Sequence, residues 1–296
     1  MNQRASVHPE SAAPAPRAAV AAVVAAALAE DAPWGDISGE SSIPASVTAR
    51  AELASREAGV LAGTDCIVEA FRQADPSAEI TLHLRDGAPL EPRIHIATVS
   101  GNARAILRAE RIALNFAQRL SGVATLTARY VAAVDGTGAR IADTRKTTPG
   151  LRMLERAAVR AGGAHNHRFS LSDAVMLKDN HLAVLKAQGL DLTEAIRAVR
   201  ARIPHTMHLE VEVDRLDQLP AVLAAEPDTV MLDNFDLASL REGVALVGGR
   251  CVVEASGGVT LETVRAIAET GVDVISVGAL THSARALDLG LDIGTV

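Results

Sequence analysis

Residues 208–234 read HLEVEVDRLDQLPAVLAAEPDTVMLDN, two short β-rich runs separated by a helical stretch. The spacing predicts strands over 208–213 and 229–232 and a helix over 214–224. A strand that returns through a helix pairs in parallel with the next strand, by a right-handed crossover. This stretch therefore predicts one strand–helix–strand unit of a parallel sheet.

The same alternation continues on both sides of that unit. Further strands are predicted over 139–143, 174–177, 251–254 and 273–277, and further helices over 191–202, 236–246 and 260–270. Six strands fit either a barrel or a doubly wound sheet. Polar groups or glycines follow every strand, and a barrel brings all of these ends to one mouth. We therefore expect a barrel-like parallel α/β fold with its site at the carboxyl ends of the strands.

The first part of the chain has a different pattern, typical of a small α+β unit. Strands are expected within 47–61 and 78–99, and a helix over 64–74. An amphipathic helix is predicted over 103–120, with Ser121 and Gly122 ending it before a second helix that reaches about Val134. Residues 30–44 are rich in turn formers and are expected to form a loop, and residues 1–16 a loose tail.

Composition limits the possible functions. Among 296 residues the net charge is −7, which argues against nucleic acid or an anionic membrane surface as the main partner. Cys66 and Cys251 are the two cysteines and offer no disulfide framework, which indicates a reducing compartment. The apolar run at 18–29 resembles part of a signal peptide, but it is too short to cross a bilayer and has no clear cleavage site. An alanine-rich helix is the favoured interpretation.

A phosphate site is expected at the last two predicted strands. Ser256, Gly257 and Gly258 follow one strand and Gly278 follows the other, each ahead of a predicted helical turn. Helix N-termini offer free N–H groups to anions, and barrels often hold phosphate at this place. His282 lies one turn further on and is a candidate phosphate contact. Simple turn glycines are the alternative interpretation.

Positive charge gathers between residues 143 and 181. Arg145, Lys146, Arg168 and Lys178 occupy strand ends or loops, where arginine suits carboxylates and lysine suits phosphates. A second set, Arg152, Arg156 and Arg160, recurs at helical spacing and is expected to form one solvated helix face. The predicted mouth therefore suits a substrate with several negative charges.

Two carboxylates are predicted at the same mouth. Glu212 and Asp233 belong to neighbouring strands and lie at or near their carboxyl ends. Within a cationic site they are expected to hold Mg²⁺ with substrate phosphates, or to bind sugar hydroxyls. The alternative is that they only neutralise the lysines.

The chain resembles the quinolinate phosphoribosyltransferase family, also called nicotinate-nucleotide pyrophosphorylase (carboxylating), over nearly its whole length. The motifs that carry the resemblance are EDAPWGDIS at 30–38, RAERIALNFAQRLSGVAT at 108–125, ADTRKTTPGLR at 142–152, GGAHNHR at 162–168, MLKDNH at 176–181, LEVEVD at 209–214, VMLDNF at 230–235 and EASGGV at 254–259. One departure lies at Ala164-His165, where members more often have a smaller or apolar residue before the asparagine.

The resemblance implies an N-terminal α/β sandwich domain over 1–120, an open barrel-like parallel α/β domain over 121–280, and a C-terminal segment over 281–296 that returns to the first domain. It also implies a cytoplasmic homodimer whose sites are completed across the interface, and Mg²⁺ as cofactor. By motif, the quinolinate pocket would contain Arg111, Arg145, His167, Arg168 and Lys178. Contacts to phosphoribosyl pyrophosphate would come from Lys146, Glu212 and Asp233, and the 5-phosphate site from Ser256, Gly257, Gly278 and His282.

The implied reaction joins quinolinate to phosphoribosyl pyrophosphate and gives nicotinate mononucleotide, pyrophosphate and carbon dioxide, a step of NAD biosynthesis. Two alternatives stay open at this point. One is a Schiff-base lyase that uses Lys146 or Lys178, which requires a lysine of lowered pKa in a dry pocket. The other is a non-catalytic protein of the same fold linked to oxyanion transport. The number of arginines is unexplained by the first, and the complete set of cations argues against the second.

Overall fold

The computed structural model describes residues 14–187 and 189–295, so most of the predicted tail at 1–16 lies outside the described residues. The chain forms two compact units. Unit 1 contains Met1–Ala128, Thr147–Gly163 and Leu280–Val296, and unit 2 contains Arg129–Lys146 and Ala164–Ala279. No described helix combines the length and the apolar character that crossing a bilayer requires.

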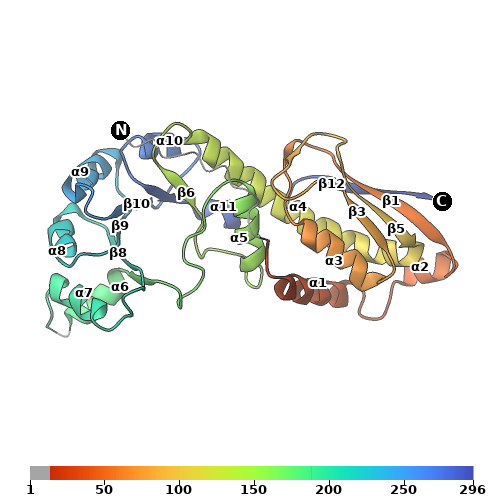
Figure 1. The fold of residues 1–296 in the computed structure, drawn as a ribbon, viewed down its shortest axis with the longest axis horizontal. Coiled ribbons are helices and arrows are strands. Elements are labelled where there is room, and N and C mark those ends of the chain that lie inside the picture. The colour runs from red at the N-terminus through yellow and green to blue at the C-terminus, as the bar shows by residue number, and fades with distance from the viewer. Residues whose placement is uncertain (1–13, 188, 296) are drawn as a thin grey trace. The chain divides into compact units, whose positions relative to one another are not determined.

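Unit 1 is built on a four-stranded antiparallel sheet in the order β12-β1-β5-β3 (Figure 1). The strands are β1 (Thr48–Ser55), β3 (Glu79–Leu82), β5 (His95–Asn102) and β12 (Leu289–Thr295), and a small ladder joins β2 (Gly59–Val60) to β4 (Pro89–Leu90). The last strand, β12, pairs with the first along its whole length. Residues from the C-terminal part of the chain therefore complete the N-terminal sheet.

Unit 1 also contains helices, and most of them fall where the sequence predicts them. They are α1 (Arg17–Asp31), α2 (Ile37–Ser42), α3 (Thr64–Ala74), α4 (Ala103–Ala133), α5 (Arg152–Ala161) and α11 (Ala279–His282), the last starting one residue before the unit boundary. Helix α2 corrects the prediction of a loop over 30–44. The Ser41 hydroxyl donates to the Ile37 carbonyl and the Ser42 hydroxyl to the Ser38 carbonyl, at 2.6 Å each. Serine also favours turns, but here both hydroxyls form hydrogen bonds to carbonyls within a short helix.

Helix α4 is continuous, and the predicted break at Ser121-Gly122 is wrong. Both residues are small because the backbone of other segments lies against them. The Ala62 N–H donates to Ser121 Oγ at 3.0 Å, and a Cβ atom on Gly122 would lie 1.8 Å from the carbonyl oxygen of Arg285. Ser121 is also fully buried. The two residues therefore mark close packing rather than a turn.

Unit 2 is built on a six-stranded parallel sheet in the order β6-β11-β10-β9-β8-β7. All six predicted strands are confirmed: β6 (Arg140–Ala142), β7 (Val175–Leu177), β8 (Leu209–Val213), β9 (Thr229–Asp233), β10 (Val252–Ser256) and β11 (Val274–Ser276). Strands β6 and β7 are edges, so the sheet is open and barrel-like rather than closed. A bridge from Ala142 to His165 extends the β6 edge.

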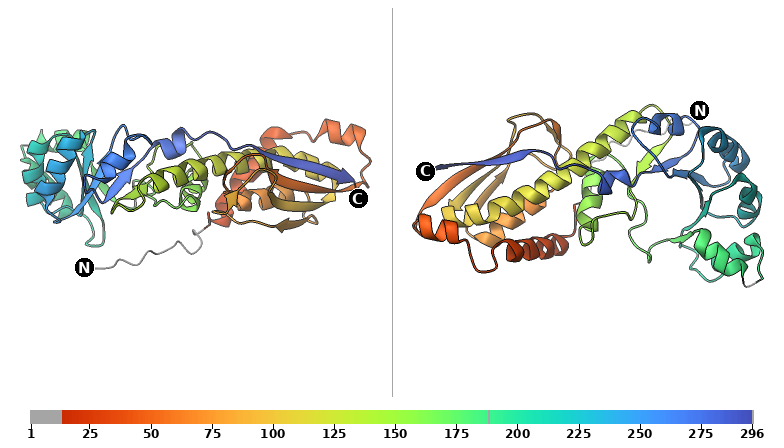
Figure 2. Two further views of the ribbon diagram at one scale, coloured as in Figure 1. Left: turned by 90° about the horizontal axis from the view of Figure 1, so that it is seen from above. Right: turned by 180° about the vertical axis from the view of Figure 1, so that it is seen from behind.

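Helices lie on the outer face of this sheet, as Figures 1 and 2 show for the segment from β8 to β10. They are α6 (Asp179–Lys186), α7 (Leu192–Arg200), η1 (Leu216–Gln218), α8 (Leu219–Ala224), α9 (Leu237–Val247) and α10 (Val264–Ala268). Side chains alternate along each strand. On β8, Leu209 and Val211 are fully buried on one face, which leaves Glu210 and Glu212 on the other.

Candidate active site

The carboxyl ends of β8, β9 and β10 form one polar edge in unit 2. Asp233, the last residue of β9, pairs with Ser256, the last residue of β10, and Glu212 pairs with Met231 two positions before Asp233. The Asn234 N–H donates to the Ser256 carbonyl at 2.9 Å. The two predicted carboxylates and the predicted phosphate turn therefore lie at the same edge.

Gly257 is required by the way these strand ends pack. Its φ is +92°, a conformation that favours glycine, and a Cβ atom would lie 2.2 Å from Asn234 Oδ1. Asn234 itself has a φ of 59°, in the left-handed region that asparagine tolerates. The turn after β10 thus lies directly on the exit of β9 and leaves no room for a side chain between them.

Lys178 contacts one of the carboxylates at this edge. Its Nζ atom forms an ion pair with Glu212 Oε2, and its backbone N–H donates to His181 Nδ1 at 3.1 Å. The Lys178 side chain keeps 42% of its surface exposed, whereas Glu212 keeps 14%. An open cavity of about 760 Å³ adjoins the pair and is lined by Glu212, Asp233, Asn234 and Asp179 among others. Lys178 is therefore joined to the wall of this cavity through its ion pair with Glu212.

The exit of β6 is held by Asp143, which sequence reasoning did not assign a role. Asp143 is fully buried and accepts hydrogen bonds from Asn166 Nδ2 at 2.6 Å and from the His167 N–H at 2.7 Å. It therefore ties the segment containing His167 to the strand that leads into Arg145 and Lys146. The signal available was its place directly before those cations and its apolar preceding residues.

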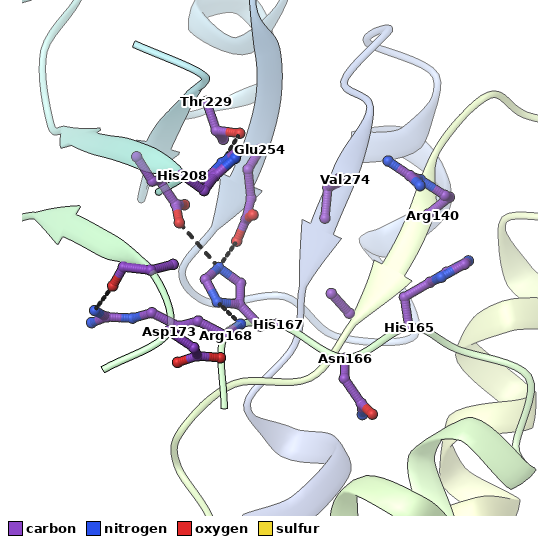
Figure 3. A pocket seen from close by; sticks show the side chains of 13 residues that line it. Arg140, His165, Asn166, His167, Arg168, Asp173, His208, Thr229, Glu254 and Val274 are labelled. Carbon is purple, nitrogen blue, oxygen red and sulfur yellow. Dashed lines mark hydrogen bonds and ion pairs between the residues drawn. The ribbon is translucent and has the colours of Figure 1, made fainter. Parts of the chain in front are cut away.

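His167 lies inside the open barrel, between two buried glutamates (Figure 3). Its Nε2 atom is 3.3 Å from Glu210 Oε2 and 3.4 Å from Glu254 Oε1. Burial disfavours the charged ring, but the hydrogen bonds to Glu210 and Glu254 outweigh it and raise the pKa of His167 to about 10. Burial raises the pKa of Glu210, and the neighbouring Glu254 adds to that rise.

These three side chains have the ligand types of a metal site, and their ligand atoms lie within 4.8 Å of one another. The hydrogen-bond geometry favours a proton instead. With a pKa of about 10 the ring holds a proton on Nε2, directed at the two carboxylates, at neutral pH, and the backbone nitrogen of Arg168 lies 2.7 Å from Nδ1. Binding a metal at Nε2 would require moving that proton. We therefore describe the group as a buried cluster of one histidine and two glutamates.

Arg168 is held on the same segment by backbone and sulfur contacts. Its Nη1 donates to the Ala174 carbonyl at 3.0 Å, and its Nη2 lies 3.7 Å from Met176 Sδ. Burial lowers the pKa of Arg168, and the positive charge of Arg145 lowers it further. Arg168 also lines, with His167, a pocket of about 360 Å³ whose other walls include the first residues of several strands (Figure 3).

Two family models match the chain without overlap. The model described as "Quinolinate phosphoribosyl transferase, N-terminal domain" covers residues 36–121, and the corresponding C-terminal domain model covers residues 123–292. The chain belongs to the quinolinate phosphoribosyltransferase family. The expected family and fold class are therefore confirmed.

Individual relatives agree with this assignment over nearly the full chain. The "Probable nicotinate-nucleotide pyrophosphorylase [carboxylating]" of Bacillus subtilis is 42% identical, over 89% of this chain and 90% of the relative. The enzyme of that name from Mycobacterium leprae is 43% identical, over 90% and 94%. Among solved structures, the nicotinate-nucleotide pyrophosphorylase of Francisella tularensis superposes with a TM-score of 0.88 at 36% identity, covering 96% of this chain and 99% of that one.

The structure shows contacts between only some of the residues predicted for the site. Lys178 and Glu212 form an ion pair, Asp233 and Ser256 are strand partners, and Arg145 lies near enough to Arg168 to affect its pKa. His167 contacts Glu210 and Glu254, two residues that sequence reasoning left without a role. The signal for Glu210 was its position two residues before Glu212, which places both on one face of β8.

The two turns predicted to bind phosphate differ in whether a helix follows them directly. Gly278 directly precedes α11, and His282, at the end of that helix, is exposed, with Nδ1 2.7 Å from Ser283 Oγ. The turn after β10 does not open a helix, however. Helix α10 starts only at Val264, because Thr260 and Thr263 form a separate hydrogen-bonded turn ahead of it. The prediction of a helix N-terminus at Ser256-Gly258 is therefore wrong.

The departure from the family pattern at Ala164-His165 is accommodated by the backbone. The His165 N–H donates to the Ile141 carbonyl at 2.9 Å, and the Asp143 N–H donates to the His165 carbonyl at 3.1 Å, so this residue pairs with β6. Burial lowers the pKa of the His165 ring, and Arg140 adds to this effect. The segment reaches Asn166 and His167 through main-chain bonds that do not depend on which side chain stands at 165.

One predicted row of solvated arginines is corrected, and a second set of arginines, on α4, differs among its members. On α5, Arg152, Arg156 and Arg160 are each half-buried rather than solvated. On α4, Arg104 Nε donates to the Ile43 carbonyl at 2.7 Å and Arg108 Nη2 donates to the Ala74 carbonyl at 2.8 Å. Among the described residues no hydrogen bond or ion pair involves the Arg111 side chain, which is exposed. Arg111 thus differs from Arg104 and Arg108, because its exposed guanidinium group makes no hydrogen bond or ion pair with the described residues.

Proposed function

We infer that this chain transfers the phosphoribosyl group of phosphoribosyl pyrophosphate to quinolinate, with loss of carbon dioxide, and so forms nicotinate mononucleotide and pyrophosphate for de novo NAD biosynthesis. The observation that carries the assignment to a site is the Lys178–Glu212 ion pair. It joins a residue proposed for the quinolinate pocket to one proposed for phosphoribosyl pyrophosphate. The pyridine and the sugar must meet in the reaction, so their two subsites must be adjacent.

The proposed quinolinate subsite consists of cations. Arg145, Arg168 and Lys178 would face the two carboxylates of the substrate, and Arg111 of a second subunit would add to them. Arg145 lies near enough to Arg168 to lower the pKa of Arg168, so two positive charges of the proposed subsite are near one another. His167 would contribute through its position beside Arg168, and its buried glutamates would fix the ring. Planar guanidinium groups recognise carboxylates through paired hydrogen bonds, which suits a dicarboxylate.

The proposed phosphoribosyl pyrophosphate subsite combines cations, carboxylates and the glycine turn. Lys146 would contact the pyrophosphate, and Ser256, Gly257, Gly278 and His282 would contact the 5-phosphate. Glu212 and Asp233 offer oxygen ligands on neighbouring strands, the donor type that Mg²⁺ prefers, although Glu212 also pairs with Lys178 and Asp233 accepts from Asn234 Nδ2 at 2.7 Å. When bound, Mg²⁺ would offset the charge of the leaving pyrophosphate.

The chemistry requires positioning and charge stabilisation more than a nucleophilic side chain. The pyridine nitrogen forms a bond to the anomeric carbon as the bond to pyrophosphate breaks, and the sugar gains oxocarbenium character. Lys146 would stabilise the negative charge on the departing pyrophosphate. Alkylation makes the ring a pyridinium, whose positive nitrogen stabilises the electron pair left on the adjacent ring carbon when the carboxylate on that carbon departs as carbon dioxide. A proton then replaces the carboxylate on that carbon.

The Schiff-base alternative finds no support at Lys178. A lysine that forms an imine must be neutral in a dry pocket. Lys178 is instead partly exposed and bound to Glu212. We further propose that the protein is a cytoplasmic homodimer, which the exposed and uncontacted Arg111 supports because a second subunit could supply its partner.

The direct test of the function is the release of pyrophosphate in the presence of each pyridine acid. We expect release with quinolinate and at least roughly 10⁴-fold lower kcat/KM with nicotinate, because nicotinate lacks the second carboxylate that the proposed cationic pocket would bind. Nicotinate mononucleotide and carbon dioxide, each equimolar with pyrophosphate, are the matching readouts. Comparable turnover of nicotinate would overturn the substrate assignment.

Asp233→Asn tests the acidic pair. We expect kcat to fall by about 10- to 1000-fold, because the neutral amide stabilises the sugar or cation less in the transition state, while the Kd for quinolinate alone changes less than about threefold. Calorimetry gives the Kd, and steady-state assays at saturating substrate give kcat. A variant that binds quinolinate poorly but turns over normally at saturation would place Asp233 in the other subsite.

A further inference from the structure

A buried ion pair in unit 1 joins two segments that carry proposed site residues. Glu155, on α5, is fully buried, and its Oε1 atom accepts from Arg119 Nη2 at 2.8 Å. The same Oε1 accepts from Thr148 Oγ1 at 2.7 Å, and Oε2 accepts from the Thr148 N–H at 3.0 Å. Both oxygens of Glu155 therefore hold Thr148, and Thr148 is the second residue after Lys146.

The other partner, Arg119 on α4, reaches a different segment. Its Nη1 donates to the Ala284 carbonyl at 2.7 Å, and its Nη2 also donates to the Thr281 carbonyl. These carbonyls lie on either side of His282, at the end of α11. One guanidinium thus contacts the carboxylate that fixes Thr148 and the main chain that carries His282.

We propose that Arg119 and Glu155 are positioning residues for phosphoribosyl pyrophosphate, which hold Thr148, two residues after Lys146, relative to the main chain at Thr281 and Ala284 that flanks His282. This rests on the proposed function, in which Lys146 contacts the pyrophosphate and His282 the 5-phosphate. These groups are at opposite ends of one substrate, so the distance between the two protein segments must match the length of that substrate. The hydrogen bonds of this cluster, to Thr148 on one segment and to the Thr281 and Ala284 carbonyls on the other, all lie within unit 1.

Chemistry favours a positioning role over a purely stabilising one. A buried ion pair is seldom more stabilising than well-packed apolar residues of similar size, since both charges lose their hydration. The pair does fix the orientation of the groups that it binds, because a carboxylate and a guanidinium form hydrogen bonds in defined directions. Here the bound groups are a threonine hydroxyl, its N–H and two carbonyls, all on segments without regular strand pairing.

The test uses substitutions at Thr148, which touches Glu155 but is not itself proposed to contact substrate. Thr148→Val keeps the shape and removes the donated hydroxyl bond, whereas Thr148→Ser retains that bond. We expect Thr148→Val to raise the KM for phosphoribosyl pyrophosphate about 10-fold or more and to lower kcat, with the Kd for quinolinate alone changed less than about twofold. Thr148→Ser should keep at least about half of the wild-type kcat/KM.

Arg119→Lys and Arg200→Lys form a matched pair for the other side of the cluster. Arg200 in unit 2 also joins a carboxylate, Asp228 at 2.7 Å, to a backbone carbonyl, that of Met207 at 3.2 Å, but near the amino ends of the strands. Lysine cannot reproduce the fork of arginine at either place. We expect both variants to lose thermal stability and only Arg119→Lys to lose affinity for phosphoribosyl pyrophosphate.

The outcomes separate this inference from the function itself. Wild-type protein that releases no pyrophosphate with quinolinate would refute the proposed function. Active wild-type protein with a Thr148→Val variant of unchanged KM would refute the positioning role alone. Equal losses in Thr148→Val and Thr148→Ser, or equal kinetic losses in Arg119→Lys and Arg200→Lys, would also refute it, because the effect would then follow general destabilisation. If Arg119→Lys does not fold, the two Thr148 variants still decide.

Discussion

An equal mixture of Arg111→Ala and Lys146→Ala protein, unfolded together and refolded, should recover roughly a quarter of the sites of wild-type protein, because random pairing makes about half of the dimers mixed. In each mixed dimer one site takes Lys146 from one chain and Arg111 from the other and is complete. The second site lacks both side chains. Each variant refolded alone should fall roughly 100-fold or more below wild type, since removal of a charge from a desolvated pair costs several kcal/mol.

The expectation rests on the difference between Arg111 and its helical neighbours. Arg104 and Arg108 donate to carbonyls of unit 1, whereas Arg111 is exposed and has no described contact. An arginine that matches a substrate-binding position of the family but makes no hydrogen bond or ion pair with the described residues of its own unit fits a role in a second subunit. Wild-type protein refolded alongside is the positive control. A mixture that stays as inactive as its components, while the control recovers, would show that Arg111 does not act across an interface.

Gly122→Ala should prevent stable folding or lower the melting temperature severely. The added Cβ would lie 1.8 Å from the Arg285 carbonyl oxygen and 2.9 Å from its carbon, both of them backbone atoms that cannot rotate away. Overpacking of side chains usually costs about 1–3 kcal/mol, and a clash with main chain on both sides allows less relaxation. We expect a loss at or above that range, measured by urea unfolding of soluble protein or by the soluble yield if none is recovered.

Gly138→Ala is the matched control for this substitution. A Cβ at Gly138 meets no atom within 4 Å, and its φ is not in the left-handed region. The same chemical change should there alter stability by less than about 1 kcal/mol, and any loss of chain entropy in the unfolded state acts in its favour. Equal stability of the two variants would mean that α4 and the segment at Arg285 can separate at little cost.

The parallel sheet could be predicted because its strands are short, apolar and regularly spaced. Each of the six strands is flanked by turn formers and followed by a helical stretch, so local pattern and tertiary structure agree. The wrong predictions arise where the local sequence pattern and the tertiary structure disagree. Ser121 and Gly122 are small because main chain from distant segments packs against them, not because the helix ends there. On α5 the arginines have the spacing of an exposed helix face, but their side chains are half-buried. Such contacts depend on segments far away in the sequence.

Some of the site residues could be predicted from the sequence and others could not. Glu212, Asp233 and Lys178 could be placed at one edge because each stands at the end of a strand. The cluster of His167 with Glu210 and Glu254 could not, because it depends on how a loop with no regular pattern enters the barrel from the β6 edge. The burial of Glu155 could not be predicted either, since a glutamate in an amphipathic helix usually faces water.

The pairing of β12 with β1 has a consequence for synthesis on the ribosome. β1 emerges early and β12 after every other described strand, so the outer edge of β1 waits for its partner. At about 5–20 residues per second this interval is on the order of tens of seconds. During it an unpaired strand edge is open to other nascent chains. We therefore expect crowded polysomes to make this protein aggregate through β1, and a chaperone that covers extended segments to raise its soluble yield.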